Sequence, residues 1–249
     1  MAREYLISTN SQTRKITFWL FAAVSALQLL AVTFQLSTLQ QITKPLIIPT
    51  LAVLFMARAG NVPVKAKVVM LTGLLFSFAG DTLLMFVNRQ PGFFIAGLGA
   101  FLVAHLMYIL LFNLAIVKKY KKRVVIKRPI LALPLIIYGL AIYDILLPSL
   151  GGLAIPVLAY VLAITFMGLS AQNRRFKTSS PSFWHVFGGA LFFMASDSVL
   201  GINKFLYNDS LPMGGLIIMA TYIVGQWYIT EGIVKHYDDV AAGFQRVEE

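Results

Sequence analysis

Apolar runs long enough to cross a bilayer recur from one end of this 249-residue chain to the other. A transmembrane helix needs roughly 20 such residues. Hydrophobic residues make up 58% of the sequence and charged residues 12%, which is about half the charged fraction of an ordinary soluble domain. The sequence therefore predicts an all-α, polytopic membrane protein.

Eight transmembrane helices are expected. We place them at about 17–36, 45–57, 67–87, 93–117, 129–147, 152–171, 184–206 and 212–233. The second is expected to begin at Pro45, because proline suits the first turn of a helix. The division that follows is a cytoplasmic N-terminal segment (1–16), one eight-helix membrane domain (17–233) and a cytoplasmic C-terminal tail (234–249).

Lysine and arginine are distributed very unequally between the two sides of this arrangement. The side with both termini carries 18 of them, seven within KKYKKRVVIKR at 118–128, whereas the other side carries only Lys44, Arg89 and Lys204. The positive-inside rule then places both termini in the cytoplasm. The net charge of +11 is thus explained by topology, and no nucleic-acid partner is expected.

Two aspartates interrupt apolar runs, and their surroundings resemble each other. LLFSFAGDTLLM contains Asp81 and ALFFMASDSVLG contains Asp197, each with a small residue before the aspartate and a hydroxyl residue after it. Both expected helices run from cytoplasm to exterior. The pattern is compatible with a parallel repeat of two four-helix halves, and equally with chance similarity between apolar segments.

The two aspartates are expected at the same depth in the membrane. They lie 14 and 13 residues from the cytoplasmic starts of their expected helices, which at the helical rise is about 20 Å, beyond the bilayer midplane. Ionisable residues at such depth are costly and by default suggest function. Their carboxyls could meet only if the third and seventh helices are neighbours.

Other polar residues fall at similar depth and on single helical faces. His105 and Tyr108 are three residues apart, and Tyr222 and Gln226 are four apart. Taken singly, each is also compatible with ordinary helix packing. Together with the aspartates they predict a polar cavity.

Three further residues are expected at the exterior mouth of that cavity. Asn203 and Lys204 follow Asp197 by six and seven residues towards the exterior, and Lys44 enters the membrane from the same side. The cavity is therefore expected to open to the exterior leaflet.

Two buried carboxyls that repel each other favour a state with one protonated and one ionised. Such a pair suits hydrolysis through an oxocarbenium-like species or peptide hydrolysis by an aspartyl dyad. An intramembrane protease is disfavoured, because the segment reads FAGD where that class has G-x-G-D. An ion- or proton-coupled transporter stays open as the alternative. No metal is expected, since the three histidines are scattered over different helices.

Several segments together resemble the YhhN family, the lysoplasmalogenases. They are Lys44-Pro45, GDTLLM, AFLVAHLMY, GALFFMASDSVLGINKF and a late Y-x-x-x-Q, spread over about residues 40–230. One departure is Gly225, where the family pattern leads us to expect alanine. The resemblance implies hydrolysis of the vinyl-ether bond of lysoplasmalogens to a fatty aldehyde and glycerophosphoethanolamine or glycerophosphocholine.

The resemblance also implies that Asp81 and Asp197 carry the chemistry, without metal or cofactor. Lys44, Lys204 and Asn203 are expected near the substrate's polar headgroup. The residues expected to orient water and the carboxyls are His105, Tyr108, Tyr222 and Gln226. The expected partners are a lysophospholipid substrate and membrane lipids, and the expected location is the bacterial cytoplasmic (inner) membrane.

Overall fold

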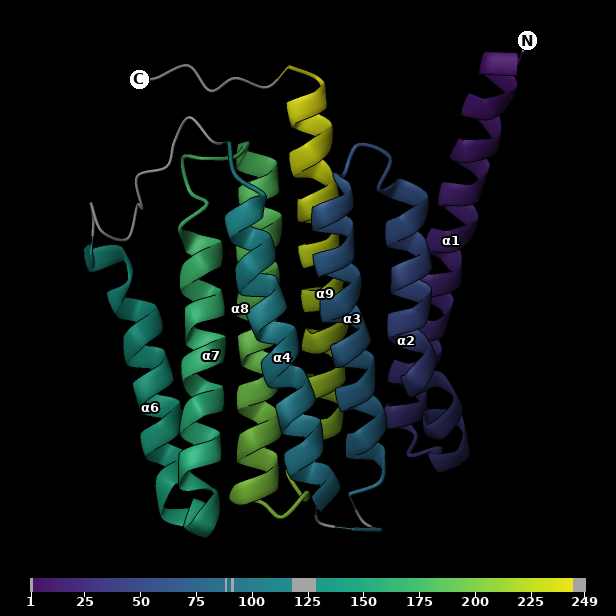
Figure 1. The fold of residues 1–249 in the computed structure, drawn as a ribbon. Helices are drawn as coiled ribbons and strands as arrows, with labels where there is room; N and C mark the ends of the chain where they lie inside the picture. The colour runs from purple at the N-terminus through teal and green to yellow at the C-terminus, as the bar shows by residue number, and fades with distance from the viewer. Residues whose placement is uncertain (1, 88, 91, 118–128, 244–249) are drawn as a thin grey trace.

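The computed structural model describes residues 2–87, 89–90, 92–117 and 129–243, and within these ranges it contains helices and no β-strand. The long helices stand side by side with roughly parallel axes, so that the molecule is a single bundle (Figure 1). The start of α1 and the end of α9 lie at the same end of this bundle. We call this the termini end.

The helices of the described residues follow one another along the chain. Their bounds are α1 (Ala2–Thr33), α2 (Ser37–Arg58), α3 (Val64–Met85), α4 (Gly92–Leu114), η2 (Pro129–Leu131), α6 (Leu133–Leu150), η3 (Gly151–Leu153), α7 (Ala154–Gln172), α8 (Ser180–Phe205) and α9 (Gly214–Ala241).

Seven segments of the described chain are long and apolar enough to cross a membrane, and the protein is an integral membrane protein. The difference from the eight expected crossings has a local cause. Residues 133–172 form one unbroken helical run, in which the single turn η3 joins α6 to α7. Gly151 allows the reversal with a φ of +50°, a value that glycine adopts readily. Figure 1 shows α6 and α7 side by side.

The expected start of the second helix at Pro45 is wrong. The helix begins at Ser37, and both Pro45 and Pro49 lie inside it. A buried hydrogen bond of 2.5 Å from Thr43 Oγ1 to Gln28 Oε1 joins this early part of α2 to α1. Proline removes only one backbone donor, so packing of this kind can hold the helix together across it.

Helical structure also continues through both expected domain boundaries. α1 extends from Ala2 well before residue 17, and α9 continues past residue 233 to Ala241. His236, which the sequence places in the C-terminal tail, is only 2% exposed in the last turns of α9. The strongly basic segment 118–128 lies outside the described residues.

The interior of the bundle is organised by two closely packed helical hairpins, α3–α4 and α8–α9. Glycines let the helices approach, as small residues commonly do in membranes. A Cβ on Gly189 would lie 2.8 Å from the backbone oxygen of Gly225, and a Cβ on Gly80 would lie 2.6 Å from the ring of Phe101. Each hairpin therefore acts as one tightly joined unit.

The two hairpins stay apart from each other. No described Cα of α3 or α4 lies within 8 Å of a described Cα of α8 or α9. Long side chains cross this layer, and the hydroxyls of Tyr222 and Tyr108 make hydrogen bonds from one hairpin to the other. This layer between the hairpins holds the candidate site.

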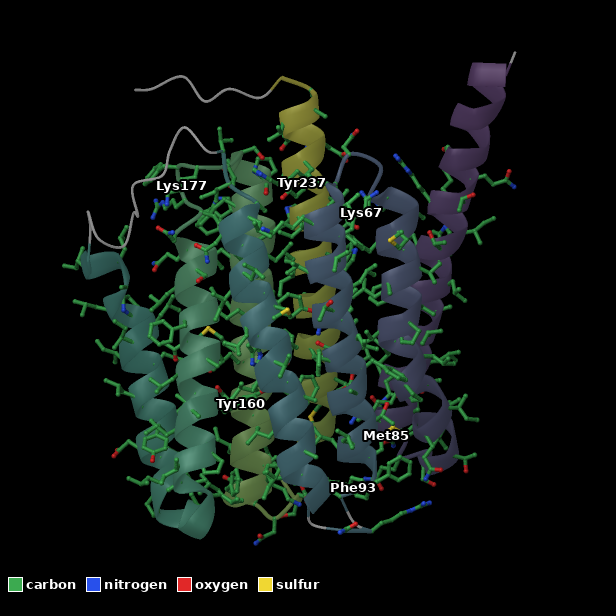
Figure 2. All side chains as sticks on the ribbon, viewed as in Figure 1. Lys67, Met85, Phe93, Tyr160, Lys177 and Tyr237 are labelled. Carbon is green, nitrogen blue, oxygen red and sulfur yellow. The ribbon has the colours of Figure 1, made fainter. Side chains whose placement is uncertain are left out.

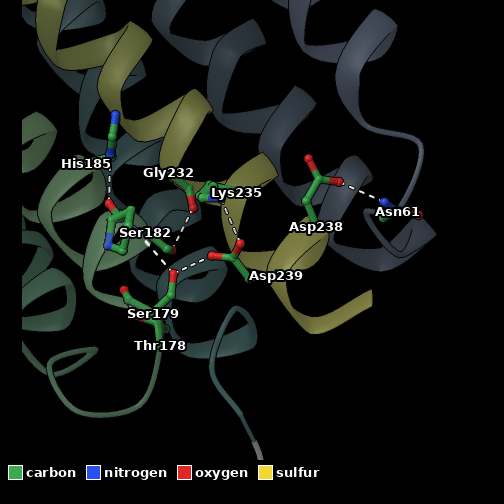
Figure 3. A network of polar contacts seen from close by, with 10 residues as sticks. Asn61, Thr178, Ser179, Ser182, His185, Gly232, Lys235, Asp238 and Asp239 are labelled. Carbon is green, nitrogen blue, oxygen red and sulfur yellow. Dashed lines mark hydrogen bonds and ion pairs between the residues drawn. The ribbon is translucent and has the colours of Figure 1, made fainter. Parts of the chain in front are cut away.

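The termini end of the bundle is tied together by polar contacts (Figure 3). Ser179 Oγ donates to Asp239 Oδ2 at 2.5 Å, Ser182 Oγ donates to the carbonyl of Gly232 at 2.8 Å, and Asn61 Nδ2 donates to Asp238 Oδ1 at 2.8 Å. These contacts join α9 to the start of α8 and to the α2–α3 connection. They close this end of the molecule.

A buried arginine adds to the same closure. The Arg174 guanidinium, just after α7, donates to the carbonyl of Ala115 at 3.1 Å and to Ser182 Oγ at 3.0 Å. Burial lowers its pKa to about 9 from the ordinary 12.5. The side chain therefore links the end of α4 to the start of α8.

Candidate active site

Asp81 belongs to a pair of side-chain hydrogen bonds that join α3 to α9, which we call the polar ladder. Tyr222 Oη donates to Asp81 Oδ2 at 2.7 Å, and Gln226 Nε2 donates to Ser77 Oγ at 3.0 Å. On each helix the two partners are four residues apart, so they share one face. Asp81 is only 4% exposed, which places its carboxyl inside the bundle.

Tyr108 extends this ladder to a third helix, α4. Its hydroxyl donates to Gln226 Oε1 at 2.6 Å, so the Gln226 amide is hydrogen-bonded on both its oxygen and its nitrogen. The ring of Tyr108 fits against Gly73 of α3, whose Cβ position would be 3.1 Å from the ring. The structure thus brings together four of the residues singled out in the sequence: Asp81, Tyr108, Tyr222 and Gln226.

Asp197 on α8 also accepts a hydrogen bond from a tyrosine. Tyr160 Oη, from α7, donates to Asp197 Oδ2 at 2.5 Å. His105 Nε2, from α4, lies 3.3 Å from the same oxygen, although neither ring nitrogen has hydrogen-bond geometry to a described residue. Figure 2 shows Tyr160 between the end marked by Lys67 and Lys177 and the end marked by Met85 and Phe93. The Asp197 group therefore lies within the apolar length of the bundle.

The two carboxyls form two adjacent subsites. No hydrogen bond between described residues joins Asp81 to Asp197. The ring of Phe193 lies between their partners, with centroids 4.9 Å from His105 and 5.4 Å from Tyr222. Phe193 thus separates two aspartate–tyrosine pairs.

The three residues expected at the mouth have different surroundings. Lys204 Nζ pairs with Asp209 at 2.7 Å and lies 5.9 Å from the centre of the Phe94 ring. Asn203 Oδ1 accepts from the backbone N–H of Leu211 at 2.9 Å, and so orders the α8–α9 loop. Lys44 is half-buried on α2.

A pocket opens beside Asp197, between α4, α6, α7 and α8. Its empty volume is about 570 Å³, which includes the space at its mouth. Asp197 and Tyr160 are among its lining residues, and Asp81 is not. Of the two carboxyls, Asp197 is therefore the one that a molecule in this pocket would meet.

Sequence reasoning missed several partners of the site. Of these partners, Tyr160 could most readily have been predicted. It lies six residues from the start of α7, and Asp197 lies eight residues from the end of α8, so the two are at nearly the same depth from one end of the bundle. Ser77 precedes Asp81 by one helical turn, which also marks it as a neighbour. Phe193 carries no sequence signal that separates it from the other phenylalanines.

The hydroxyl residues that follow the two aspartates make identical contacts. Thr82 Oγ1 donates to the carbonyl of Phe78, and Ser198 Oγ donates to the carbonyl of Met194, each at 2.8 Å and four residues back. The aspartates also occupy the first helix of each tightly packed hairpin. A repeat of two halves remains a prediction.

An apolar helical bundle with two aspartate–tyrosine pairs inside it defines an integral membrane protein with an intramembrane polar site. Comparison with protein families then identifies the family to which the chain belongs. The model of the YhhN family matches residues 39–233, and the chain belongs to this family. No solved structure matches it.

Curated relatives carry a functional name. The chain is 30% identical over 175 residues to "Lysoplasmalogenase TMEM86A" of Homo sapiens, which covers 68% of this chain and 66% of the human protein. It is 33% identical over 189 residues to "Lysoplasmalogenase" of Mycobacterium tuberculosis, covering 74% of this chain and 67% of that protein. The chain thus spans about two thirds of the length of these relatives.

Proposed function

We propose that this protein is an intramembrane lysoplasmalogenase, which hydrolyses the vinyl-ether bond of lysoplasmalogens. The observation that carries the proposal is the Asp197 carboxyl on the wall of a pocket, hydrogen-bonded by Tyr160 and 3.3 Å from His105. The names of the relatives support the same bond and substrate. None of the relatives named above is called a transporter.

The first step proposed is protonation of carbon. A vinyl ether is a nucleophile at its β-carbon, so its π electrons take the proton of a carboxylic acid there. The positive charge that results is shared between the α-carbon and the ether oxygen as an oxocarbenium ion. A nearby carboxylate stabilises this cation, as in glycoside hydrolysis.

The second step adds one water molecule. Water attacks the α-carbon and gives up a proton to a carboxylate, which restores the acid and leaves a hemiacetal. The hemiacetal hydroxyl then loses its proton and becomes the aldehyde carbonyl, while the bond from the α-carbon to the glycerol oxygen breaks and that oxygen takes up a proton and leaves as an alcohol. The products are a fatty aldehyde and glycerophosphoethanolamine or glycerophosphocholine, with one water consumed.

The geometry favours different roles for the two aspartates. Asp197 lines the pocket and is proposed to meet the vinyl ether, with Tyr160 and His105 orienting its carboxyl. Asp81 does not line the pocket. It is proposed to contribute the second carboxyl group from outside the pocket wall, where Tyr222 holds it by a hydrogen bond. Tyr108 and Gln226 keep that ladder in place.

The polar end of the substrate is proposed to lie towards the end away from the termini. Lys204 is at that end near Phe94, a lining residue of the pocket, and Asn203 orders the same loop. Lys44, half-buried near the start of α2, is proposed as a second cation for the phosphate. With both termini in the cytoplasm of a bacterial inner membrane, this end faces the exterior.

Incubation of the purified protein with a defined lysoplasmenylethanolamine tests the proposal. We expect release of the fatty aldehyde from the wild type. Asp81→Asn and Asp197→Asn are expected to lower the rate at least 100-fold, because asparagine can neither give a proton nor stabilise a cation. Asp144→Asn, at an exposed position on α6, is the matched control and should keep full activity.

The same reaction in D₂O checks the mechanism. Protonation of the β-carbon predicts one deuterium at carbon 2 of the aldehyde, fixed by immediate reduction to the alcohol and read by mass spectrometry. Free aldehyde treated identically is the control for exchange. Absence of aldehyde from folded wild type would exclude the enzyme, and full activity in both asparagine variants would exclude this site.

A further inference from the structure

We infer that the pocket between α4, α6, α7 and α8 holds the single hydrocarbon chain of the phospholipid substrate, and that the chain reaches it from the bilayer between α6 and α8. The inference rests on the proposed function and adds where the apolar part of the substrate lies. Its lining residues lie in the first parts of α4 and α7 and in the second half of α8, so the pocket is in the half of the bundle away from the termini.

The lining of the pocket suits a hydrocarbon chain. Four helices contribute apolar side chains to it, such as Leu98, Ile142, Val161 and Met194. Polar lining groups are confined to Asp197, its partner Tyr160, Thr165, and the pair formed by Tyr138 and Ser198.

The order of groups along the pocket matches that of a single-chain phospholipid. Lys204 lies at the outer end, where its ammonium group is 5.9 Å from the ring centre of the lining residue Phe94. Asp197 is seven residues earlier on α8, about 10 Å deeper at the helical rise. Met194 lies deeper again. Such a lipid presents its phosphate, ether bond and chain in the same sequence.

Helix α6 forms the lipid-facing wall of the pocket. Among the long described helices it packs only against α7 and α8, so it is the most weakly attached part of the wall. Its Tyr138 donates to Ser198 Oγ of α8 at 2.7 Å, and both residues line the pocket. Tyr138 is 38% exposed at the surface of the bundle. This hydrogen bond therefore spans the seam that a chain from the bilayer would cross.

The pocket is expected to position the chain more than to attract it. A chain that leaves the bilayer for an apolar pocket exchanges one apolar environment for another, so burial itself contributes little. What the pocket supplies is the location of the first carbons of the chain beside Asp197. A bulky residue in the pocket should therefore displace the reacting bond.

Photolabelling tests the location of the chain directly. The probe is a single-chain phospholipid with a saturated ether bond and a diazirine in the chain, applied to the reconstituted wild type. It has no double bond to protonate, so labelling does not depend on turnover. We expect peptide mapping to find adducts on the pocket-lining faces of α6 and α7, suppressed by excess lysoplasmenyl lipid.

A pair of tryptophan variants on α6 supplies the matched control. Ile142→Trp fills the pocket and should lower both pocket labelling and aldehyde formation about 10-fold or more, the scale of overpacking one site. Leu140→Trp, at a position 62% exposed, should leave both unchanged. Thermal unfolding of each variant verifies that it is folded.

The outcomes separate this inference from the proposed function. Adducts spread over outer faces of the bundle, with aldehyde still produced, would overturn the chain site and leave the enzyme standing. Adducts confined to the pocket without aldehyde would support the chain site and overturn the enzyme. Wild-type labelling of folded Ile142→Trp would also overturn the chain site.

Discussion

At the scale of single residues, the site is built from carboxyls that each receive a tyrosine hydroxyl. Tyr222 donates to Asp81 and Tyr160 to Asp197, from different helices. A buried carboxyl without a donor is costly in hydrocarbon, so these phenols help to make two intramembrane aspartates tolerable. They also fix the direction in which each carboxyl points.

Removal of one phenol should affect turnover more than binding. Tyr160→Phe keeps the ring against His105 but removes the donor to Asp197 Oδ2. A hydrogen bond to a charged group contributes about 1.5–3 kcal/mol, so kcat should fall about 10- to 100-fold with KM little changed. Steady-state kinetics of aldehyde release measures the two constants separately.

Tyr143→Phe is the control for that substitution. Its hydroxyl donates to the carbonyl of Ala154 at 3.3 Å, and it does not line the pocket. Its activity should match the wild type. An equal loss in both variants, or a rise in KM alone for Tyr160→Phe, would contradict the assigned role.

Residue positions along single helices were predictable from the sequence, whereas partners across helices were not. The four-residue spacing of Tyr222 and Gln226 correctly predicts that both point to one neighbour, which is α3. Spacing holds no information about which helix that neighbour is. For the same reason Tyr160, 37 residues from Asp197, was missed.

At the scale of helices, packing overrides local propensity. Pro45 favours a helix start, yet α2 begins eight residues earlier because its first turns pack on α1. Conversely, glycines weaken an isolated helix but here permit the close backbone contact between α8 and α9. Sequence patterns show that these helices exist, but their pairing depends on contacts between distant segments.

The glycine at position 225 provides a test of that packing. A Cβ there would lie 2.9 Å from the backbone nitrogen of Phe193 and 3.0 Å from the backbone oxygen of Gly189. Gly225→Ala should therefore force α8 and α9 apart, at about 1–3 kcal/mol, and lower the apparent Tm in detergent. This outcome is expected although the family pattern has alanine at this place.

Gly188→Ala is the matched control on the same interface. Its Cβ would meet only the ring of Tyr228, at 3.6 Å, which is an ordinary contact. Its apparent Tm should stay near that of the wild type. If Gly225→Ala is equally stable, the close approach of the two helices is not as the structure describes.

At the scale of the whole molecule, the two ends of the bundle differ. The termini end is closed by hydrogen bonds such as Ser179 to Asp239 and by the buried Arg174, whereas the pocket lies in the opposite half. Apolar runs alone were enough to predict an integral membrane protein. They could not predict this difference, which arises from side chains brought together by folding.

The orientation of these ends can be measured, because the chain contains no cysteine. Gly60 belongs to the α2–α3 connection, at the termini end, and Gly152 belongs to η3 between α6 and α7, at the opposite end. A Cβ at either position would meet no atom within 4 Å. With cytoplasmic termini, a membrane-impermeant maleimide should label Gly152→Cys in bacterial spheroplasts. It should label Gly60→Cys only after detergent is added. The reverse pattern would invert the topology.

The difference between the two ends has a consequence for what happens after cleavage. The proposed products differ sharply in polarity, since one is an oily aldehyde and the other a water-soluble phosphodiester. On the inferred path, the seam between α6 and α8 leads sideways into lipid. If the termini are cytoplasmic as proposed, the hydrogen-bonded termini end lies between the site and the cytoplasm. The aldehyde is then expected to diffuse into the membrane, and the phosphodiester to be shed on the far side. One catalytic event would thus sort its products into two compartments.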